Sequence, residues 1–289
     1  MENRHPIILN CGKLFSLSKT VTSGQCFRWS REDSTGGYSA VVFGQAVTAV
    51  QEGEKLTVYI DSGAEEKPNS EQLLREYFDL NSDYEEMDRL ILQAEPRLLK
   101  AAEFARGVHI LRQEKWEALC SFIISQNNNI GRIRGIIARF CELAGEHIGG
   151  GQYAFPTPEA AASLTGEDYK NLGFGYRGDY MVSAAKMVSG GAIDLEELAK
   201  LPTEEAREQL LKIKGVGPKV AECVLLYGFG RMSCFPIDVW VKRALEELFD
   251  GDRSILECEY AGVAQQYVFE YMRLSGGFDK EKKFTASAK

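Results

Sequence analysis

The pattern of apolar residues changes once along the chain, from the alternation of strands to the spacing of helices. Three short runs rich in β-branched and aromatic residues lie at 38–43, 46–50 and 56–60, with short polar or glycine-containing links between them. From Ser70 onward the apolar residues follow helical spacing, and no convincing strand follows Pro96. The sequence therefore predicts an α+β fold in which an N-terminal antiparallel sheet precedes an all-helical part.

Helical segments follow one another through the second part of the chain. One ends at the glycine run 149–151, and another begins at Thr157-Pro158, a capping residue followed by proline at the first helical position. The expected helices lie at about 114–125, 128–144, 158–164, 176–189, 203–212, 218–228, 239–249 and 256–273. We expect two domains, a β-rich one with flanking helices over residues 1–105 and a helical one over residues 106–289.

Composition argues against several classes of protein. No apolar run approaches the roughly 18–20 residues of a membrane span, and the first residues lack the apolar core of a secretory signal. The seven cysteines are odd in number and include no C-x-x-C pair. This usage argues against a disulfide framework and against a clustered zinc or iron–sulfur site, and it fits a reducing compartment.

Net charge by itself does not identify the partner. The formal charge is −8, which taken alone argues against nucleic acid. Ten acidic and three basic residues within 61–90 supply nearly all of this excess, whereas residues 101–141 hold six basic and three acidic residues. A positive face on an acidic protein is therefore compatible with the composition.

A tight glycine turn joins two of the expected helices. The segment 213–221 reads Ile-Lys-Gly-Val-Gly-Pro-Lys-Val-Ala, so that Gly215 and Gly217 stand just before a proline suited to the first helical turn. Such a turn presents backbone N–H groups and a helix N-terminus outward, which forms a phosphate site without basic side chains. The alternative is a corner between helices that requires glycine only for steric reasons.

This turn and a second element resemble the helix-hairpin-helix DNA glycosylase superfamily. The segment 235–240, Phe-Pro-Ile-Asp-Val-Trp, is similar to that superfamily's P-V-D-x-x stretch. Lys219 and Asp238 are nineteen residues apart, which is the spacing of its catalytic lysine and aspartate. The resemblance implies that the helical part is a helix-hairpin-helix DNA glycosylase domain with Lys219 and Asp238 as its catalytic residues.

Excision of a base by an amine explains why these two residue types are needed. A lysine must be neutral to attack, and partial burial beside a helix N-terminus favours the neutral amine. A nearby carboxylate stabilises the cationic sugar that develops as the base leaves. Taken singly, each residue favours a structural reading, with Lys219 as a solvated surface residue and Asp238 as a helix N-cap. Together with the glycine turn, they indicate catalysis.

A run of three asparagines narrows the resemblance to one family. The segment 125–133, Ser-Gln-Asn-Asn-Asn-Ile-Gly-Arg-Ile, is similar to the S-x-N-N-N-I-x-R-I stretch of eukaryotic-type 8-oxoguanine DNA glycosylases. Amides and a guanidinium on one turn suit the pairing edge of an orphaned cytosine. The resemblance assigns Asn127 and Arg132 to that role, and the alternative is a set of polar helix caps.

A second segment of the helical part also resembles this family. The segment 172–177, Leu-Gly-Phe-Gly-Tyr-Arg, is similar to the family's L-G-x-G-Y-R stretch. The resemblance implies that Tyr176 is the ring wedged into the base stack beside the extruded base. It implies Arg177 as a second reader of the opposite cytosine. The alternative is an ordinary Gly-Tyr-Arg turn.

A glycine near the start of the chain is the candidate for lesion recognition. The segment 23–29, Ser-Gly-Gln-Cys-Phe-Arg-Trp, resembles the family's S-G-Q-x-F-R-W stretch. Guanine and 8-oxoguanine differ chiefly at O8 and at N7, which is an acceptor in guanine and an N–H donor in the lesion. A backbone carbonyl beside that atom accepts from the lesion and repels the normal base, and Gly24 lets the backbone come that close.

The last expected helix contributes further candidates for the base pocket. Gln265 and Phe269 are four residues apart and share a helix face, as do Cys223 and the lysine four residues before it. By resemblance, Cys223 and Phe269 sandwich the base while Gln265 reads its pairing edge. The adjacent Gln266 leaves the register ambiguous by one, although the A-G-x-A-Q pattern favours Gln265. Without the resemblance, Cys223 and Phe269 read as ordinary core residues.

The chain departs from the family at two positions. Lys214 replaces the usual proline of the hairpin, and Trp240 stands where the eukaryotic enzymes generally carry a phosphate-contacting histidine. The indole N–H of Trp240 can still donate to a phosphate. The family also implies a monovalent cation on the carbonyls of Leu211, Ile213 and Val216, and no other cofactor. Because no four-cysteine cluster follows, the endonuclease III type with its iron–sulfur cluster is not expected.

The resemblance extends over roughly residues 7–275 and implies a bifunctional DNA repair enzyme. Such an enzyme excises 8-oxoguanine from double-stranded DNA, preferably opposite cytosine, and then cleaves the strand by β-elimination. Two alternatives stay open: a monofunctional alkylpurine glycosylase, which typically lacks the lysine, and a non-catalytic helix-hairpin-helix DNA-binding protein, which needs neither Lys219 nor Asp238. We expect a monomer of the cytoplasm, nucleoid-associated in a prokaryote, without a membrane partner.

Overall fold

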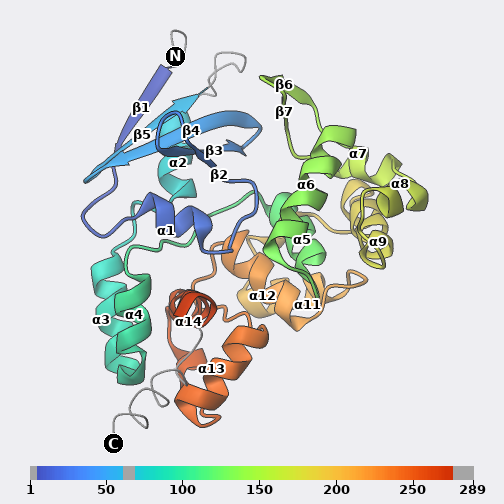
Figure 1. The fold of residues 1–289 in the computed structure, drawn as a ribbon. Helices are drawn as coiled ribbons and strands as arrows, with labels where there is room; N and C mark the ends of the chain where they lie inside the picture. The colour runs from blue at the N-terminus through green and yellow to red at the C-terminus, as the bar shows by residue number, and fades with distance from the viewer. Residues whose placement is uncertain (1–4, 61–68, 276–289) are drawn as a thin grey trace, which may run out of the picture.

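The sheet and the helices occupy different parts of the molecule. The computed structural model describes residues 5–60 and 69–275. In Figure 1 the sheet formed by the first sixty residues lies at one end, and the helices of the later chain fill the rest. This arrangement confirms the predicted α+β fold, with an N-terminal antiparallel sheet followed by helices.

Five strands form the sheet in the order β1-β5-β4-β3-β2, and every neighbouring pair is antiparallel. The strands are β1 (His5–Asn10), β2 (Ser30–Glu32), β3 (Gly37–Val42), β4 (Gln45–Glu52) and β5 (Lys55–Ile60). β3, β4 and β5 confirm the three predicted runs. The edge strands β1 and β2 carry too little apolar pattern to be predicted, because β2 is short and polar and β1 brings only Ile7 and Leu9 into the core.

One face of the sheet packs on a helix that follows it in the chain. Leu9 and Leu56, which are paired across β1 and β5, are both fully buried. The helix α2 (Ser70–Tyr77) packs against the core beneath the sheet (Figure 1). Trp29 is also buried there, and its indole N–H donates to the Tyr77 hydroxyl at 2.8 Å. This bond satisfies the polar atom that burial of the indole would otherwise leave unpaired.

The remaining helices build the second part of the molecule, apart from the first, which lies between β1 and β2 and packs on the core under the sheet. They are α1 (Leu17–Thr22), α3 (Tyr84–Ala94), α4 (Leu99–Ala105), α5 (Lys115–Ser125), α6 (Ile130–Ala144), α7 (Pro158–Ser163), α8 (Gly166–Asn171), α9 (Arg177–Ser189), α10 (Leu195–Leu198), α11 (Thr203–Leu211), α12 (Pro218–Tyr227), α13 (Val239–Phe249) and α14 (Ala261–Ser275). No helix in the described ranges has the length and apolar character needed to cross a membrane.

The helical part differs from its prediction in three places. Two short strands follow the predicted last strand, because the glycine run 149–151 turns a small hairpin of β6 (His147–Gly149) and β7 (Gln152–Tyr153). The short helices α8 and α10 lack a long apolar face and are fixed by their caps, a capping box in α8 and Asp194 in α10. The predicted helix 256–273 begins only at Ala261, after a 3₁₀ turn.

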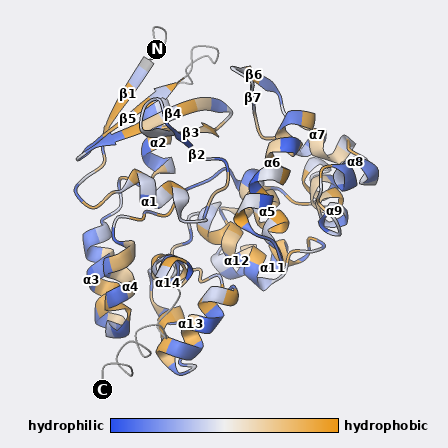
Figure 2. Ribbon diagram, in the orientation of Figure 1, coloured by the Kyte–Doolittle hydropathy of each residue, from blue (hydrophilic) through white to orange (hydrophobic). Residues whose placement is uncertain are grey.

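The structure has two apolar cores, and no single position in the sequence divides their residues. The smaller core lies under the sheet and draws mainly on residues up to 80, while α3 and α4 join the larger core with α14. Residues 84–105 therefore pack with the helical part, whereas the predicted boundary at 105 groups them with the sheet. Figure 2 shows hydrophobic residues concentrated in α5 and α12, near the centre of the helical part.

A buried ion pair connects the sheet to the helices. Arg28, which follows α1, lies 3.4 Å from Glu117 of α5 and donates a second hydrogen bond to the carbonyl of Tyr153 in β7. Both charged side chains are largely buried. Burial raises the pKa of Glu117 from its ordinary value of 4.5 to about 7, although the charge of Arg28 opposes this shift.

We predict that stability depends on pH through Glu117. The pKa of Glu117 is higher in the folded state than in the unfolded chain. The stability that this difference contributes is therefore fully present below about pH 4.5 and is lost as the pH rises through about 7. The difference in free energy of unfolding between the Glu117→Gln variant and the unmodified chain should therefore shift in favour of the variant by about 2–3 kcal/mol as the pH rises from about 5 to about 8. Urea unfolding at several pH values measures this difference, with exposed Glu205→Gln as the matched control. A pH-independent difference would show that Glu117 titrates normally.

Candidate active site

The glycine turn between α11 and α12 has the predicted tight geometry. Gly215 has a φ of +84°, and a Cβ there would lie 2.1 Å from the ring of Tyr180. Only glycine satisfies both constraints. Gly217 is the N-cap of α12, and a Cβ on it would meet no atom within 4 Å. The space above the N-terminus of α12 is therefore open.

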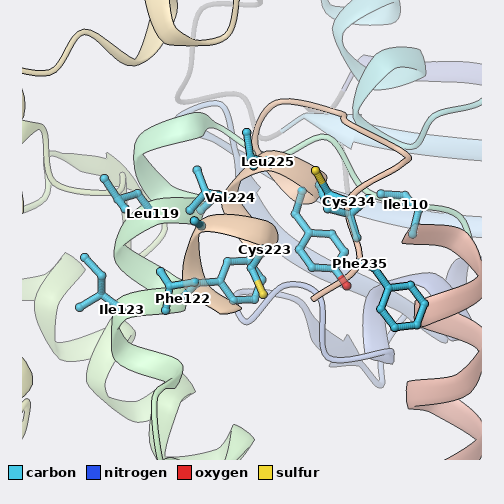
Figure 3. Close-up of a cluster of buried hydrophobic side chains, with 14 of the residues drawn as sticks. Ile110, Leu119, Phe122, Ile123, Cys223, Val224, Leu225, Cys234 and Phe235 are labelled. Carbon is cyan, nitrogen blue, oxygen red and sulfur yellow. The ribbon is translucent and has the colours of Figure 1, made fainter. Parts of the chain in front are cut away.

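Lys219 lies in the first turn of α12 and points toward α5. Its half-buried side chain donates a hydrogen bond to Ser125 Oγ at 3.2 Å. The same Nζ lies 5.2 Å from the centre of the Phe122 ring. The close packing of α5 on α12, seen in Figure 3 around Phe122 and Cys223, sets this position.

Cys223 lies one helical turn after Lys219. Its thiol is buried and within hydrogen-bonding reach of the Lys219 amine. Burial raises the pKa of Cys223 to about 11, although the charge of Lys219 opposes the shift. The thiol is therefore neutral near pH 7 and presents an apolar surface rather than a nucleophile.

Asp238 both caps α13 and interacts with Lys219. Its carboxylate accepts a hydrogen bond from the backbone N–H of Val241 at 2.8 Å, which is the N-cap arrangement. Burial raises the pKa of Asp238, whereas the Val241 hydrogen bond and the charge of Lys219 lower it. The two readings of this residue are therefore compatible, because the cap holds the carboxylate where it acts electrostatically on the amine.

Gly24 lies directly against Phe269 of α14. Its φ is +80°, and a Cβ would lie 3.1 Å from Cε1 of Phe269 and 3.5 Å from Cδ1 of Ile130. Glycine is therefore favoured both by the backbone conformation and by the close approach of the ring. The first segment of the chain and its last helix meet at this point.

The structure distinguishes the two adjacent glutamines of α14. Gln266 uses both ends of its amide, donating to the Ser23 carbonyl at 3.0 Å and accepting from the Tyr227 hydroxyl at 2.7 Å. Gln265 accepts a longer bond from the same hydroxyl at 3.3 Å. Among the described residues its amide nitrogen has no partner, so Gln265 keeps donors for a bound base.

The three asparagines have different roles in the loop between α5 and α6. Asn128 donates to the Ile124 carbonyl at 3.1 Å, and Asn129 accepts from the backbone N–H of Arg132 at 2.9 Å as the N-cap of α6. Asn127 has a φ of +46° and is exposed. The polar-cap reading therefore holds for Asn128 and Asn129, and Asn127 is exposed without capping a helix.

Asn127 in the loop before α6, Arg132 in the first turn of α6 and Tyr176 at the N-cap of α9 are all exposed. The amide of Asn127 donates to the Tyr176 hydroxyl at 3.2 Å, and the Arg132 guanidinium reaches the Gly173 carbonyl at 3.4 Å. Half of the Tyr176 surface is exposed. An aromatic ring, an amide and a guanidinium thus line one surface beside the glycine turn.

Arg177 lies beneath this surface rather than on it. It is 3% exposed, and its guanidinium donates to the carbonyls of Gln126, Asn127 and Phe174. The same group lies 4.5 Å from the centre of the Tyr176 ring. In this conformation Arg177 holds the Gln126–Asn127 backbone and supports the ring, so the structure does not present it as a direct reader of an opposite base.

Trp240 is partly exposed in the first turn of α13. Its side chain is 36% exposed, and the adjacent Val239 is 77% exposed. The indole therefore lies at the surface close to the capping carboxylate of Asp238. The indole N–H is a donor only, and at the surface it is suited to an acceptor such as a phosphate oxygen.

Two residues with clear positions have no role in the sequence prediction. Ser125 contacts the Lys219 amine, and Gln126 donates its side-chain amide to the Gly215 carbonyl at 3.0 Å. The backbone carbonyl of Gln126 also accepts from Arg177. Both residues stand in the asparagine-rich motif, so their place in the chain was the available signal, but only the fold shows what they contact.

Contacts link Lys219 to Gln265 and the asparagine-rich loop to the glycine turn. The Phe122 ring, which faces Lys219, stacks on Tyr227 with ring centroids 5.2 Å apart, and Tyr227 in turn contacts Gln265. Gln126 joins the exposed loop to the glycine turn. Within the described ranges, no group of three or more His, Cys, Asp or Glu side chains is arranged to hold a metal ion. The arrangement is suited to amine and carboxylate chemistry beside a phosphate-binding turn.

Two family models match consecutive parts of the chain. Residues 8–119 match the N-terminal domain of 8-oxoguanine DNA glycosylase, and residues 120–259 match the HhH-GPD superfamily of base excision DNA repair proteins. The border between these matches lies within α5, whereas the sequence analysis divides the chain at residue 105. The first match contains Gly24 and the second contains Lys219 and Asp238, whereas Gln265 and Phe269 lie beyond residue 259.

Relatives of the chain extend over most of its length. An N-glycosylase/DNA lyase of Saccharomyces cerevisiae is 31% identical over 78% of this chain and 66% of its own length. The N-glycosylase/DNA lyase of Arabidopsis thaliana is 30% identical over 90% of this chain and 74% of its own length. The Clostridium acetobutylicum 8-oxoguanine glycosylase/lyase, solved with DNA containing cytosine opposite 8-oxoguanine, has a TM-score of 0.85 and 33% identity and covers 96% of this chain and 97% of its own. With this site on this fold, the chain belongs to the 8-oxoguanine DNA glycosylase family of helix-hairpin-helix base excision repair proteins.

Proposed function

We propose that this protein excises 8-oxoguanine from double-stranded DNA and then cleaves the strand at the resulting abasic site. The observation that carries the proposal is the placement of the Lys219 amine beside Ser125, in electrostatic contact with the half-buried carboxylate of Asp238. A DNA-binding module has no need of this pair, and a monofunctional glycosylase has no need of the amine. Relatives named N-glycosylase/DNA lyase support the same activity.

Lys219 is the proposed nucleophile. Its neutral amine attacks C1′ of the sugar while the bond from C1′ to the base breaks, and the base leaves with that electron pair and takes up a proton. The carboxylate of Asp238 stabilises the positive charge that develops on the sugar. Opening of the sugar ring gives a Schiff base, and loss of a proton from C2′ then expels the 3′ phosphate. Excision and strand cleavage therefore share one covalent intermediate.

The base pocket is proposed to form between α12 and α14. Cys223 and Phe269 contact the two faces of the extruded base, and Gln265 donates to its pairing edge through the amide nitrogen that the protein leaves free. The carbonyl of Gly24 accepts the N7–H that distinguishes 8-oxoguanine from guanine. A wrong base leaves buried polar groups unpaired, which costs about 1–3 kcal/mol.

The opposite strand is proposed to meet the exposed loops. Tyr176 enters the base stack where the lesion leaves it, and Asn127 and Arg132 contact the orphaned cytosine, whose acceptors suit amide and guanidinium donors. The burial of Arg177 favours a supporting role, in which it holds the backbone of Asn127 in place. We propose a preference for cytosine on this basis. Its strength depends on contacts made only with DNA bound.

Phosphate contacts are proposed at the glycine turn. The N–H groups of Gly215 and Gly217 and the N-terminus of α12 face the DNA backbone, and Trp240 donates from the first turn of α13. The carbonyls of Leu211, Ile213 and Val216 are suitable donors for a monovalent cation, since backbone carbonyls replace the hydration shell of such ions. A cation there would hold the turn against the phosphates.

The protein is proposed to act on DNA as a monomer. All the residues in the proposed mechanism come from one chain, so a second copy is not needed to complete the site. We place the protein in the cytoplasm, on the nucleoid in a prokaryotic cell.

We predict that Lys219→Gln abolishes excision and borohydride trapping while the affinity for lesion-containing duplex is retained. The substitution removes the amine and keeps a polar side chain whose amide can still donate to Ser125 Oγ. Lys212→Gln, at the exposed C-cap of α11, is the matched control and should behave like the unmodified protein. Strand cleavage by a pure Lys219→Gln preparation would remove this assignment. Excision without trapping in the unmodified protein would indicate a monofunctional glycosylase, and binding alone would indicate a non-catalytic module.

We predict that Asp238→Asn slows single-turnover excision about 10²–10³-fold with little loss of stability. An asparagine still accepts the hydrogen bond from Val241 and so keeps the cap of α13, but it removes the charge near the developing cation. Asp83→Asn is the matched control, because Asp83 caps α3 by the same bond to the N–H of Glu86. Excision at the unmodified rate would reduce Asp238 to a helix cap.

A further inference from the structure

The carbonyl groups of four consecutive residues at the end of α1 have different surroundings. Those of Thr22, Ser23 and Gln25 each accept a hydrogen bond from a side chain elsewhere in the protein. The carbonyl of Gly24 has no partner within residues 5–60 and 69–275. We call these residues the 22–25 segment. Its hydrogen bonds leave a single acceptor, on the residue that faces Phe269.

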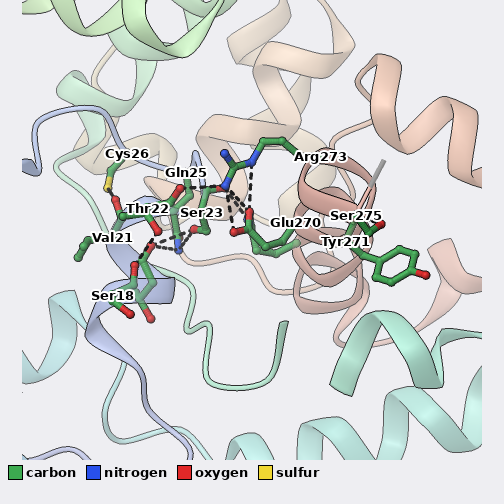
Figure 4. Close-up of polar contacts among 12 residues, drawn as sticks. Ser18, Val21, Thr22, Ser23, Gln25, Cys26, Glu270, Tyr271, Arg273 and Ser275 are labelled. Atoms are coloured by element: carbon green, nitrogen blue, oxygen red, sulfur yellow. Dashed lines mark hydrogen bonds and ion pairs between the residues drawn. The ribbon is translucent and has the colours of Figure 1, made fainter. Parts of the chain in front are cut away.

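Two of the three donors come from one face of α14. Gln266 donates to the Ser23 carbonyl at 3.0 Å, and Arg273 donates to the Thr22 carbonyl at 3.1 Å. They are seven residues apart, which is two turns of helix. Figure 4 shows Arg273 reaching the 22–25 segment from α14 with Glu270 beside it. The last helix therefore fixes the two peptide groups that precede Gly24.

Both donors are themselves held in place. The Arg273 guanidinium lies 2.7 Å from the nearly buried carboxylate of Glu270, one turn before it on the same helix. The Gln266 carbonyl oxygen accepts from the Tyr227 hydroxyl at 2.7 Å. Burial raises the pKa of Tyr227 well above its ordinary range, so this phenol keeps the proton that it donates.

The segment is also fixed on its other side. The side chain of Gln25 donates to the His109 carbonyl at 2.8 Å and accepts from the backbone N–H of Leu111 at 2.7 Å. Gln113 donates to the Gln25 carbonyl at 2.7 Å. Gly24 therefore lies between two anchored neighbours, one held by α14 and one by residues 109–113.

Glycine needs this anchoring more than any other residue does. With no Cβ, Gly24 can adopt backbone conformations closed to other residues, and rotation of its peptide groups would turn its carbonyl away from the pocket. The hydrogen bonds to Ser23 and Thr22 oppose that rotation. A carbonyl oxygen distinguishes a donor from an acceptor on a base only if it is held within a few tenths of an ångström of hydrogen-bonding geometry.

We propose that Gln266 and Arg273 are positioning residues for lesion recognition, acting by fixing the direction of the Gly24 carbonyl. The proposal rests on the proposed function, in which that carbonyl accepts N7–H of 8-oxoguanine. Neither side chain contacts the reacting atoms, and neither contacts Lys219 or Asp238 among the described residues. The chemistry on a sugar that has already lost its base should therefore not depend on them.

The test compares two reactions of the same full-length protein. Gln266→Leu and Arg273→Leu are each assayed for the single-turnover rate of 8-oxoguanine excision opposite cytosine and for strand cleavage at a preformed abasic site. We expect the excision rate to fall about tenfold to a hundredfold in Gln266→Leu, and less in partly exposed Arg273→Leu, with strand cleavage unchanged. Arg89→Leu is the matched control, since it breaks an exposed Arg–Glu pair of the same i,i+3 spacing on α3.

A second measurement reports recognition directly. Lys219→Gln prevents turnover, so binding can be measured alone. Combining it with Gln266→Leu or Arg273→Leu should bring the affinities for duplexes with 8-oxoguanine and with guanine closer together. An unchanged ratio of these two affinities, or equal loss of excision and strand cleavage, would show that the two bonds only stabilise the fold and would overturn the proposal. Failure of the unmodified protein to excise 8-oxoguanine would instead overturn the proposed function, so the two failures are distinguishable.

Discussion

The packing of α5 against α12 is the contact on which the site depends. It places Ser125 and Phe122 of one helix against Lys219 and Cys223 of the other, so that an amine at the end of a glycine turn is only half exposed. Because close-packed apolar side chains leave little room for movement, the packing of these two helices fixes the position of the Lys219 amine. The carboxylate of Asp238 then acts on an amine whose place is already fixed.

A second constraint follows from the order of the chain. Gly24 comes from the segment between α1 and β2 and Phe269 from α14, yet the two lie against each other. Hydrogen bonds from α14 and from residues 109–113 hold the neighbours of Gly24 on its two sides. The segment that leads into β2 therefore presents one glycine to the site, while the helices supply the reacting groups.

Local sequence patterns predicted much of this site, because some functions depend on neighbours in the chain. The glycine turn, Lys219 and Asp238 are such cases, as are the three strands β3 to β5. The A-G-x-A-Q pattern favoured Gln265 over Gln266, but only the fold shows that Gln266 uses both ends of its amide on Tyr227 and Ser23. Local patterns also presented Arg177 as a surface reader, because a sequence does not show that a guanidinium is turned inward to carbonyls. The edge strands and the β6–β7 hairpin were missed because short polar strands carry almost no apolar signal.

The most direct test of this account is to find which atom becomes bonded to DNA. Borohydride reduction of the protein with lesion-containing duplex, followed by proteolysis and mass spectrometry, identifies the cross-linked residue. The account predicts one modified peptide, with the sugar attached to Nζ of Lys219. Attachment to another amine, such as Lys115 or Lys214, would contradict it, because neither lies beside Asp238 and the base pocket as Lys219 does.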